Sequence, residues 1–455
     1  MINEGSESLH LPTLASGALP SGWTWRRLDS VCLGVFDCPH STPKLSESGP
    51  LMARSQDIRS GTFRCEQAAH VSEETYLERV ARAEPRWGDL LYSREGTYFG
   101  IAADVPPDQR ICLGQRMVLI RPDANVLHHR YLRYWLNSPT MKAHIDGHRD
   151  GSVAERLNLP TIRALPICTP PLAAQRQIAE VLGALDDKIE LNRRMNETLE
   201  AMARALFKSW FVDFDPVRAK MAGRAPFGMD AATVALFPDS LEQSDLGELP
   251  KGWSIGKVQD LATFSRSSLT PSDFPEEIFD HYSLPAFDEG RTPTAEPGGA
   301  IKSNKLVVPR DVVLISKLNP HIPRIWLPRL HSSRRSICST EFMVASPRTP
   351  GASREALFSL FTSPAFVSGY ISLVTGTTGS HQRIAPEALQ SMKVVIPPPA
   401  FVSLFTKLTK PTFDQINANI DQCHTLAELR DLLLPKLLSG ELRIRDAERE
   451  VENVA

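Results

Sequence analysis

The sequence predicts a mixed α/β (α+β) fold in which two globular α/β domains, related by a pseudo-twofold axis, are separated by two long antiparallel coiled-coil helices. The first observation is a duplication: segment 19–23 (Leu-Pro-Ser-Gly-Trp) recurs 230 residues later at 249–253 (Leu-Pro-Lys-Gly-Trp). The second is that the Pro-Pro ending of segment 167–171 recurs 228 residues later at 395–399. Offsets this large and this similar indicate one repeated domain, not a solenoid with units of roughly 20–50 residues. Each copy is followed by a long stretch with helical periodicity.

A chain of 455 residues is too long for one hydrophobic core and suits two to three domains. In both copies, short strand-like runs alternate with helix-like runs. The Gly-, Pro- and acid-rich segment between the copies is expected to be a linker, and the charged C-terminal tail is expected to fray. The expected boundaries are a leader at 1–19, a first domain at 20–171, a helix at 172–221, a linker at 222–248, a second domain at 249–399, a helix at 400–440 and a tail at 441–455.

The first long helix is predicted to carry a coiled-coil seam. Suitable side chains recur in alternating steps of three and four residues at Leu182, Leu185, Ile189, Asn192, Asn196, Leu199, Ala203 and Leu206. The two asparagines lower stability but fix the register and orientation of the partner helix. At about 1.5 Å per residue, about 40 residues make a rod about 60 Å long.

The second long helix is predicted to begin near Ala400. Pro411 is expected to interrupt it and Pro435 to break or kink it, because proline has no backbone N–H. Ile416 and Ile420 belong to its less regular apolar seam. We expect the two helices to pack against each other in antiparallel directions. The alternative is that each helix only covers its own domain.

The composition is that of an ordinary globular protein, with 42% hydrophobic and 23% charged residues and a net charge of −2. Any nucleic-acid surface must therefore be a local patch. Seven cysteines without a Cys-x-x-Cys pair argue against a disulfide framework and favour a reducing compartment. The N-terminal segment does not resemble a signal peptide, and no run of about 18 apolar residues occurs. We therefore expect a cytoplasmic protein that does not enter a membrane.

The sequence lacks the motifs of common catalytic sites. It has no G-x-x-x-x-G-K-[ST] phosphate loop and no G-x-G-x-x-G motif that opens a helix after a strand. The spacing of Cys32, Cys38 and His40 matches no common metal-ligand pattern. Residues 186–188 (Asp-Asp-Lys) have the form of a nuclease element, but they fall within the heptad helix, where we expect a solvated face. We therefore predict a chain without catalytic, cofactor-binding or metal-binding residues.

The strongest basic bias lies at 302–335, with eight basic residues and one acid. Arginine and asparagine suit hydrogen bonding to base edges, and lysine suits phosphates. The nucleic-acid-binding candidates in this segment are Lys302, Lys305, Lys317, Asn319, Arg324, Arg329, Arg334 and Arg335. Either Arg324→Ala or Arg334→Ala is expected to weaken DNA binding without unfolding the chain. The alternative is a solvated basic face without a ligand.

In the first copy the arginines are more dispersed, and Arg54, Arg94 and Arg116 are the leading candidates there. A Gly-Ser pair with a nearby arginine stands near the end of each domain. The serines are Ser152 and Ser380, and the arginines are Arg156 and Arg383. Backbone N–H groups at these pairs could hold a phosphate, although an ordinary turn fits equally well.

Four segments together resemble a known family. They are 175–179 (Gln-Arg-Gln-Ile-Ala), 185–192 (Leu-Asp-Asp-Lys-Ile-Glu-Leu-Asn), 206–217 (Leu-Phe-Lys-Ser-Trp-Phe-Val-Asp-Phe-Asp-Pro-Val) and 429–441 (Leu-Arg-Asp-Leu-Leu-Leu-Pro-Lys-Leu-Leu-Ser-Gly-Glu). The first three are similar to the central conserved region, and the last to the distal conserved region, of specificity subunits of type I restriction–modification systems. The resemblance covers nearly the whole chain.

The resemblance implies a non-catalytic subunit that reads a bipartite double-stranded DNA target, with one half-site for each target recognition domain. It implies that the paired helices set the unread gap and dock two methyltransferase subunits. S-adenosylmethionine, ATP and magnesium are expected in partner subunits, which include motor–nuclease restriction subunits, and no cofactor is expected in this chain. A subunit that guides modification alone fits the sequence equally well. A different class of protein, a non-catalytic coiled-coil scaffold with two protein-binding domains, is the alternative.

Overall fold

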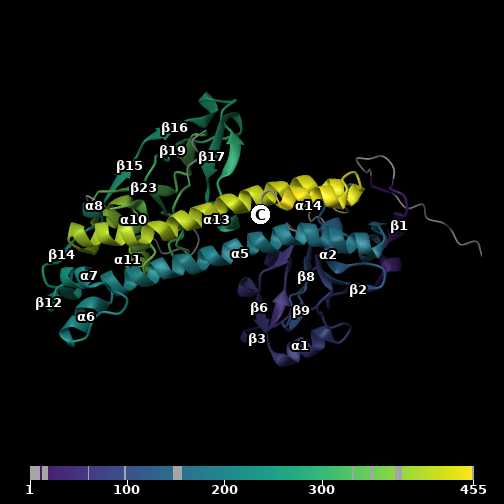
Figure 1. Cartoon of the computed structure of the whole chain (residues 1–455), viewed down its shortest axis with the longest axis horizontal. Helices are drawn as coiled ribbons and strands as arrows, with labels where there is room; N and C mark the ends of the chain where they lie inside the picture. Colours follow the sequence, from purple (N-terminus) through teal and green to yellow (C-terminus); the bar gives the residue numbers. More distant parts are fainter. Residues whose placement is uncertain are drawn as a thin grey trace, which may run out of the picture. The chain divides into compact units, whose positions relative to one another are not determined.

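The computed structural model describes residues 11–12, 19–59, 61–96, 99–146, 156–329, 333–348, 352–374 and 382–452. The chain divides into two compact units (Figure 1), of which the first comprises Met1–Asn192 with Asp421–Ala455 and the second Arg193–Ile420. Both units are mixed α/β. Each of the two long helices, α5 (Leu172–Phe211) and α13 (Pro399–Ser439), contributes one part to each unit. The predicted fold class is therefore confirmed in its two α/β domains and its two long helices.

The central sheet of the first unit is antiparallel. Its strands, in spatial order, are β2 (Cys32–Asp37), β10 (Met117–Pro122), β7 (Leu90–Ser93) and β8 (Ala102–Asp104). Successive residues of a strand point to opposite faces, so each strand serves two cores. Leu90 and Tyr92 belong to one core and Leu91 to the other. Both faces are covered, which explains the continuous apolar run at 117–120.

Smaller sheets and four short helices complete the first domain. β3 (Leu45–Ala53) is antiparallel to β6 (Ala69–Val71) and parallel to β9 (Ile111–Leu113). Two further pairs are β1 (Thr24–Arg27) with β11 (Pro166–Thr169) and β4 (Ile58–Arg59) with β5 (Thr62–Phe63). The helices are α1 (Glu73–Val80), α2 (His129–Leu136), α3 (Pro139–Asp146) and α4 (Leu159–Arg163).

The second unit repeats this topology. Its central antiparallel sheet has the order β15 (Ala262–Ser265), β23 (Phe342–Pro347), β20 (Val313–Ser316) and β21 (Ile325–Trp326). β17 (Ile278–Tyr282) is antiparallel to β18 (Thr294–Pro297) and parallel to β22 (Ser336–Cys338), as β3 is to β6 and β9. The shared strand order is the structural counterpart of the sequence duplication.

Additional strands and helices frame the second domain. The strands are β16 (Ser268–Leu269), β19 (Lys305–Val307), and the pair β14 (Ser254–Lys257) with β24 (Lys393–Ile396). The helices are α8 (Val258–Leu261), α9 (Leu284–Gly290), α10 (Arg354–Phe361), α11 (Pro364–Ser372) and α12 (Pro386–Ser391). α10 and α11 each begin at a serine whose side chain accepts a backbone N–H of the first turn.

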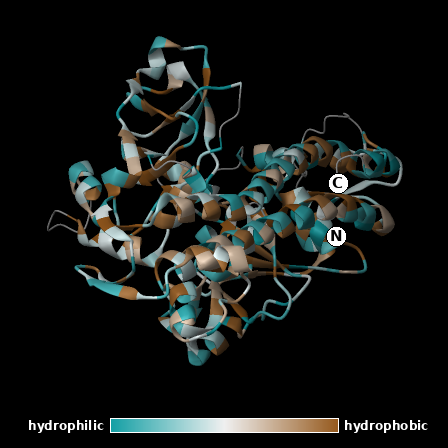
Figure 2. Ribbon diagram, turned by 60° about the vertical axis from the view of Figure 1, so that its left-hand side comes forward, coloured by the Kyte–Doolittle hydropathy of each residue, from teal (hydrophilic) through white to brown (hydrophobic). Residues whose placement is uncertain are grey.

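The two long helices pack against each other within each unit. In the first unit, Leu185 of α5 and Leu433 of α13 belong to one core. In the second unit, Ala203 of α5 and Phe413 of α13 do so. Early residues of α5 thus meet late residues of α13, and the reverse, so the helices are antiparallel in both units. The same cores contain domain residues, so the helices also cover the domains, and their ribbons accordingly carry both hydrophobic and hydrophilic residues (Figure 2).

α13 runs without interruption from Pro399 to Ser439, so the predicted breaks at Pro411 and Pro435 are wrong. An internal proline removes one helix hydrogen bond and crowds the preceding turn, at a cost of about 3 kcal/mol or more. Packing next to each proline offsets this cost, because Phe413 and Leu434 are both buried. Tertiary burial has overridden the local propensity here.

The first long helix is shorter than its predicted span of 172–221. α5 ends at Phe211, and Phe214 adopts a left-handed backbone conformation with φ 57°. α6 (Asp215–Met221) then begins as a separate helix with Pro216 in its first turn, where proline is tolerated. The reversal at Phe214 therefore divides the predicted span into two helices.

The segment 222–248, expected to be a linker, is packed structure. It contains α7 (Ala231–Leu236), β12 (Leu241–Ser244) and the start of β13 (Gly247–Pro250), which pairs with β12. Phe237 is 1% exposed, and its ring centroid lies 5.2 Å from that of Trp210.

The described part of the charged tail is also ordered, so the expected fraying is wrong there. α14 (Ile444–Glu452) places Ile444, Ala447 and Val451 on one side, and these residues pack on the core of the first unit. The charges that suggested disorder occupy its other side. Within the described ranges, no helix combines the length and the hydropathy needed to cross a membrane.

Candidate nucleic-acid interface

Acidic residues from outside the segment 302–335 neutralise part of its positive charge. Arg334 Nη1 lies 2.9 Å from Asp280 Oδ1. Arg335 donates two hydrogen bonds of 2.6 and 2.5 Å to Glu277, and these bonds lower the pKa of that carboxyl. Asp280 lies in β17, whose parallel pairing with β22 brings it beside the two arginines. The charge count of the segment therefore overstates the local positive charge.

Two of the candidates in this segment are buried. Arg324 is 9% exposed, and its guanidinium donates two 2.8 Å hydrogen bonds to the Asp288 carboxylate at α9. Lys305 is 7% exposed, its Nζ lies 2.5 Å from Ser303 Oγ, and burial lowers its pKa. Arg324 thus ties its segment to α9, and Lys305 makes a local contact, so neither buried side chain is presented on the surface.

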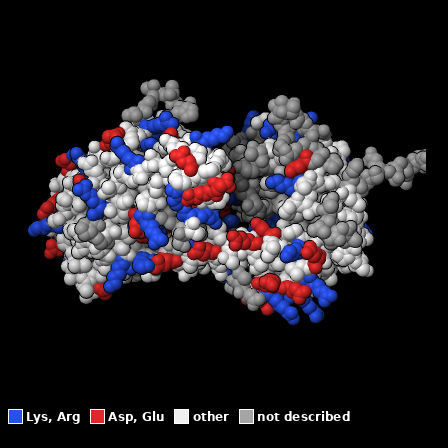
Figure 3. Space-filling view, turned by 90° about the horizontal axis from the view of Figure 1, so that it is seen from above, with Lys and Arg blue, Asp and Glu red and all other residues white. Residues whose placement is uncertain are grey.

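The other candidates of the segment reach the surface. Lys302, Arg334 and Arg335 are exposed, and Lys317, Asn319 and Arg329 are half-buried. On the face shown in Figure 3, Lys and Arg side chains lie among Asp and Glu side chains and form no single basic field. The surface thus offers separate cationic positions, which suit specific hydrogen bonding better than diffuse attraction.

The leading candidates of the first unit are all ion-paired. Arg54 bonds to Asp57 (2.8 Å), Arg94 to Asp37 (3.1 Å), and Arg116 Nε lies 3.4 Å from Glu95 Oε1. Ser152 and Ser380, the two serines of the Gly-Ser pairs, lie outside the described residues.

Arg94 and Lys317 occupy corresponding positions in the two units. Each directly follows the third strand of its central sheet, β7 or β20. The Arg94 N–H donates to the Arg116 carbonyl (3.0 Å), and the Lys317 N–H donates to the Glu341 carbonyl (2.7 Å). The predicted residues Arg94 and Arg116 therefore lie together at this edge of the first sheet. The predicted Lys317 lies at the equivalent edge of the second sheet. Glu95 and Glu341 were missed, since a lone acidic residue in a sequence carries no signal of its distant partner.

Amide side chains lie in the seam between the long helices. In the first unit, Asn192 is 1% exposed, and its Nδ2 donates to Gln422 Oε1 at 2.8 Å. In the second unit, Asn419 Nδ2 donates to Asn196 Oδ1 at 2.8 Å, and Gln415 Nε2 donates to Asn419 Oδ1 at 2.8 Å. Matched amides favour one register, because sliding the helices would leave buried amides unpaired.

The apolar seam positions are buried to different degrees. Leu182, Leu185 and Ile189 are at most 4% exposed in the first unit. Leu199, Leu206 and Ile420 are half-buried in the second unit, where Ile416 is 6% exposed. The heptad spacing therefore corresponds to a continuous inward-facing stripe.

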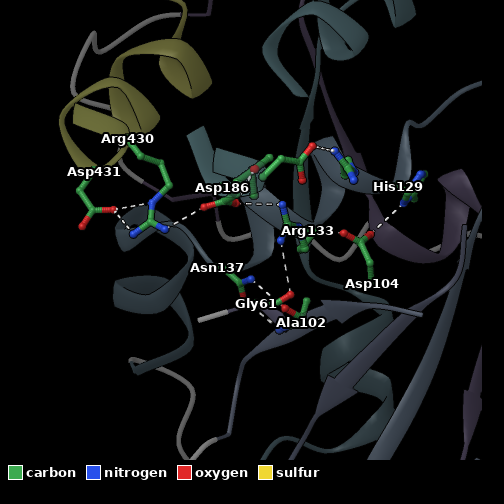
Figure 4. A network of polar contacts seen from close by, with 12 residues as sticks. Gly61, Ala102, Asp104, His129, Arg133, Asn137, Asp186, Arg430 and Asp431 are labelled. Carbon is green, nitrogen blue, oxygen red and sulfur yellow. Dashed lines mark hydrogen bonds and ion pairs between the residues drawn. The ribbon is translucent and has the colours of Figure 1, made fainter. Parts of the chain in front are cut away.

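Asp186 joins the first domain to both long helices (Figure 4). Its Oδ2 accepts hydrogen bonds from Arg133 (3.1 Å) and Tyr134 (2.6 Å) of α2, and its Oδ1 accepts from Arg430 (2.8 Å) of α13. The solvated face expected for 186–188 is thus wrong at Asp186, which is 21% exposed, whereas Asp187 is 66% exposed. The two aspartates of the triplet differ in exposure because they lie on different sides of α5, with Asp186 facing α2.

Further charges extend this network within the first domain. Asp104 lies 3.1 Å from Arg133 Nε and 2.8 Å from His129 Nδ1, and Arg133 is 7% exposed. Within the described residues, no group of three or more His, Cys, Asp or Glu side chains is placed to hold a metal ion. Cys32 sits in an unreactive setting, because burial raises the pKa of its thiol to about 12.

These features define a class: a duplicated protein whose two α/β domains each pack on a register-specified helix pair. The model of the type I restriction modification DNA specificity domain matches residues 67–201. The type I restriction enzyme HindI specificity subunit of Haemophilus influenzae is 25% identical over 419 residues, covering 80% of this chain and 89% of that protein. The MjaIX specificity subunit of Methanocaldococcus jannaschii is 25% identical over 407 residues, covering 83% and 82%.

The chain is thus similar to specificity subunits of type I restriction–modification systems, the family that its sequence motifs resemble. Among solved structures, the S subunit of a type I restriction–modification system from M. genitalium aligns with 94% of this chain and 98% of its own. The sequence identity is 13% and the TM-score is 0.47.

Proposed function

We propose that this chain is the non-catalytic subunit that gives a type I restriction–modification complex its DNA specificity. Each α/β domain binds one half-site of a bipartite double-stranded target. The observation that carries the proposal is the duplication: two domains share a strand order, while the polar side chains at their corresponding edges differ. The names of the related specificity subunits support the same function.

The DNA contacts are assigned by exposure and by position. Four residues at the corresponding edges of the two central sheets contact bases or the adjacent phosphates. They are Arg94 and Arg116 in the first unit and Lys317 and Asn319 in the second. The exposed Lys302 suits a phosphate. The second-rank candidates for DNA contacts are Arg334, Arg335, Arg54 and Arg329. Two further candidates, for phosphate contacts, are Ser152 and Ser380. Arg324 and Lys305 act through the stability of the domain.

The paired helices carry the assembly function. Two methyltransferase subunits dock on them and supply S-adenosylmethionine-dependent methylation of adenines. Motor–nuclease restriction subunits supply ATP- and magnesium-dependent translocation and cleavage. This division of labour agrees with a chain whose recognised motifs include no phosphate loop.

Mapping of DNA methylation tests the proposal. Cells would carry the methyltransferase subunit encoded beside this chain, with and without the chain itself, and methylated adenines would be located by single-molecule sequencing. The expected result is a chain-dependent motif of two short half-sites around a fixed gap. Absence of any motif, although both proteins are soluble and form a complex, would overturn the proposal.

The alternative function, a scaffold with two protein-binding domains, predicts a different dependence on salt. DNA recognition through phosphates and bases loses affinity steeply as salt rises, because neutralised phosphates release counterions. A scaffold would show only weak DNA binding with no preference for any sequence. Titration of the complex with target and scrambled duplexes at two salt concentrations separates these functions.

A further inference from the structure

Each central sheet carries, at the same edge, one exposed arginine held by one half-buried glutamate. In the first unit, Arg116 Nε lies 3.4 Å from Glu95 Oε1, and the side chains are 57% and 21% exposed. In the second unit, Arg383 Nη2 lies 2.8 Å from Glu341 Oε1, and the side chains are 59% and 25% exposed. The two pairs therefore match in type, in exposure and in location.

The two pairs share only one equivalent position, and their other members are not equivalent, because Glu95 corresponds to Leu318 and Arg383 to Arg156. Arg116 directly precedes β10, and Glu341 directly precedes β23, the equivalent strand. The segment after the third strand bridges to an arginine in both units, through Glu95 with Arg156 and Leu318 with Arg383. At the turn before β10 the first unit thus has the cation, and at the equivalent turn before β23 the second unit has the anion.

This difference in position separates a functional requirement from a remnant of duplication. A copied structural ion pair would keep its cation and anion at the same two positions. Here the shared position carries Arg116 in the first unit and Glu341 in the second, and the partner comes from a different position in each unit. An exposed guanidinium on a half-buried carboxylate is nevertheless present at this end of both sheets. Ion pairs this exposed add little to stability, typically about 0–1 kcal/mol. Stability alone therefore does not account for the recurrence.

The backbone around both arginines is fixed, which suits a recognition residue. Arg116 has a left-handed conformation with φ 69°, and its carbonyl accepts the N–H of Arg94. In the second unit, the Asn319 N–H donates to the Gln382 carbonyl (2.8 Å), which ties the loop after β20 to the residue before Arg383. Each arginine therefore projects from an anchored segment and pays less conformational entropy on binding.

We propose, building on the DNA-recognition function proposed above, that Arg116 and Arg383 are specificity-determining residues that each read one guanine. The planar guanidinium presents a fork of N–H donors that matches guanine O6 and N7 in the major groove. Glu95 and Glu341 are positioning residues that hold the fork in a fixed orientation. The first unit reads its guanine from the turn before β10, where Arg116 lies. The second unit reads its guanine from the segment around Arg383, which bridges to Leu318 after β20.

Conservative substitutions test the assignment in the complex of the full chain with its methyltransferase subunit. Arg116→Lys and Arg383→Lys keep the charge but remove the bidentate fork. Affinity would be measured by selection from a duplex library in which both half-sites are randomised. Each variant is expected to lose roughly five- to hundredfold discrimination for guanine at one position of one half-site, the range of one bidentate contact. Preferences in the other half-site stay unchanged.

Matched controls use exposed arginine–glutamate pairs away from this edge. Arg110→Lys in the first unit and Arg218→Lys in the second disturb the pairs with Glu73 and Glu248, and both should leave the recovered motif unchanged. Uniform weakening at all positions in Arg116→Lys and Arg383→Lys would identify phosphate contacts and overturn base reading. An unchanged motif in both would also overturn it. A wild-type complex with no motif would instead defeat the underlying DNA-recognition function.

The positioning role of the glutamates has a separate readout. Glu95→Gln and Glu341→Gln are expected to relax the same guanine position as the lysine variant of the same unit, by a smaller factor. Combining Glu95→Gln with Arg116→Lys should add no further loss, because both act on one contact. Full discrimination in both glutamine variants would overturn the positioning role. Loss spread over several positions would do so too, since it indicates a general structural effect.

Discussion

The carboxylate of Asp186 accepts a 2.8 Å hydrogen bond from Arg430, 244 residues later in the chain. Its other oxygen accepts hydrogen bonds from Arg133 and Tyr134 of α2. One side chain thus connects α5, α13 and the first domain. Since Arg133 is 7% exposed, removing the carboxylate leaves a buried guanidinium with only Asp104 to balance it.

Asp186→Asn is expected to destabilise the first unit by about 2–4 kcal/mol, because breaking a buried ion pair leaves one charge uncompensated. Urea denaturation followed by amide hydrogen exchange in α2 measures this loss. The matched control is Asp187→Asn, which disturbs only an exposed 3.3 Å pair with Arg130 and should change stability by about 0.5 kcal/mol or less. Equal effects of the two variants would contradict a special role for Asp186.

Arg324→Ala is expected to destabilise the second unit by about 1–3 kcal/mol, through lost packing and a lost bidentate pair with Asp288. Arg334→Ala should cost a comparable amount, about 1–3 kcal/mol, because it leaves the carboxylate of Asp280, which is 2% exposed, without its ion-pair partner. Thermal unfolding and DNA affinity, measured on both variants, separate these effects. A fully stable Arg324→Ala variant with lost affinity would return Arg324 to the DNA-binding residues.

The seam amides of the second unit are expected to be coupled. Asn419→Leu removes one partner and leaves Asn196 and Gln415 without their amide contacts, at a cost of about 1–3 kcal/mol. Replacing Asn196 and Asn419 together by leucine should be nearly neutral, because both polar groups leave the seam. Urea denaturation of the single and double variants gives the coupling energy. Strictly additive losses would show that the amides do not act together.

Burial and neighbouring cations lower the pKa of His128 from 6.5 to about 4. As pH falls below about 6.5, the unfolded chain binds a proton that the folded chain does not, so folding stability falls. The contribution is fully present above pH 6.5 and is lost toward pH 4, by on the order of 1–2 kcal/mol after allowance for partial exposure. His128→Gln should flatten this part of the stability profile measured by urea denaturation. An unchanged slope between pH 6.5 and pH 4 in His128→Gln would contradict this role of His128.

The helix pair and the duplicated domains were predictable because they rest on periodicity and repetition, which are local properties of the sequence. The heptad from Leu182 to Leu206 and the echo of Trp23 in Trp253 are visible without any tertiary information. The continuation of α13 through Pro435 was not, because the burial that offsets the proline comes from residues distant in the chain. Tertiary packing routinely overrides local propensity in this way.

The sequence predicted the location of the candidate site better than it predicted the ion-pair partners of the site residues. The sequence singled out Arg94 and Lys317, which lie at corresponding positions, but the carboxylates beside the arginines there are set by strand pairing. Glu341 lies 42 residues before Arg383, and Glu277 lies 58 residues before Arg335. No charge count along a window can include such partners, so the basic segment seemed more positive than it is.

The first unit is discontinuous in sequence, since it needs residues that begin again at Asp421. During synthesis at roughly 5–20 residues per second, that closing segment leaves the ribosome roughly 10–45 s after Asn192. Throughout this interval the apolar stripe of α5 at Leu182, Leu185 and Ile189 lacks its α13 partner. The nascent chain is therefore exposed to chaperones and to premature pairing with other copies until the segment from Asp421 onward has been synthesised.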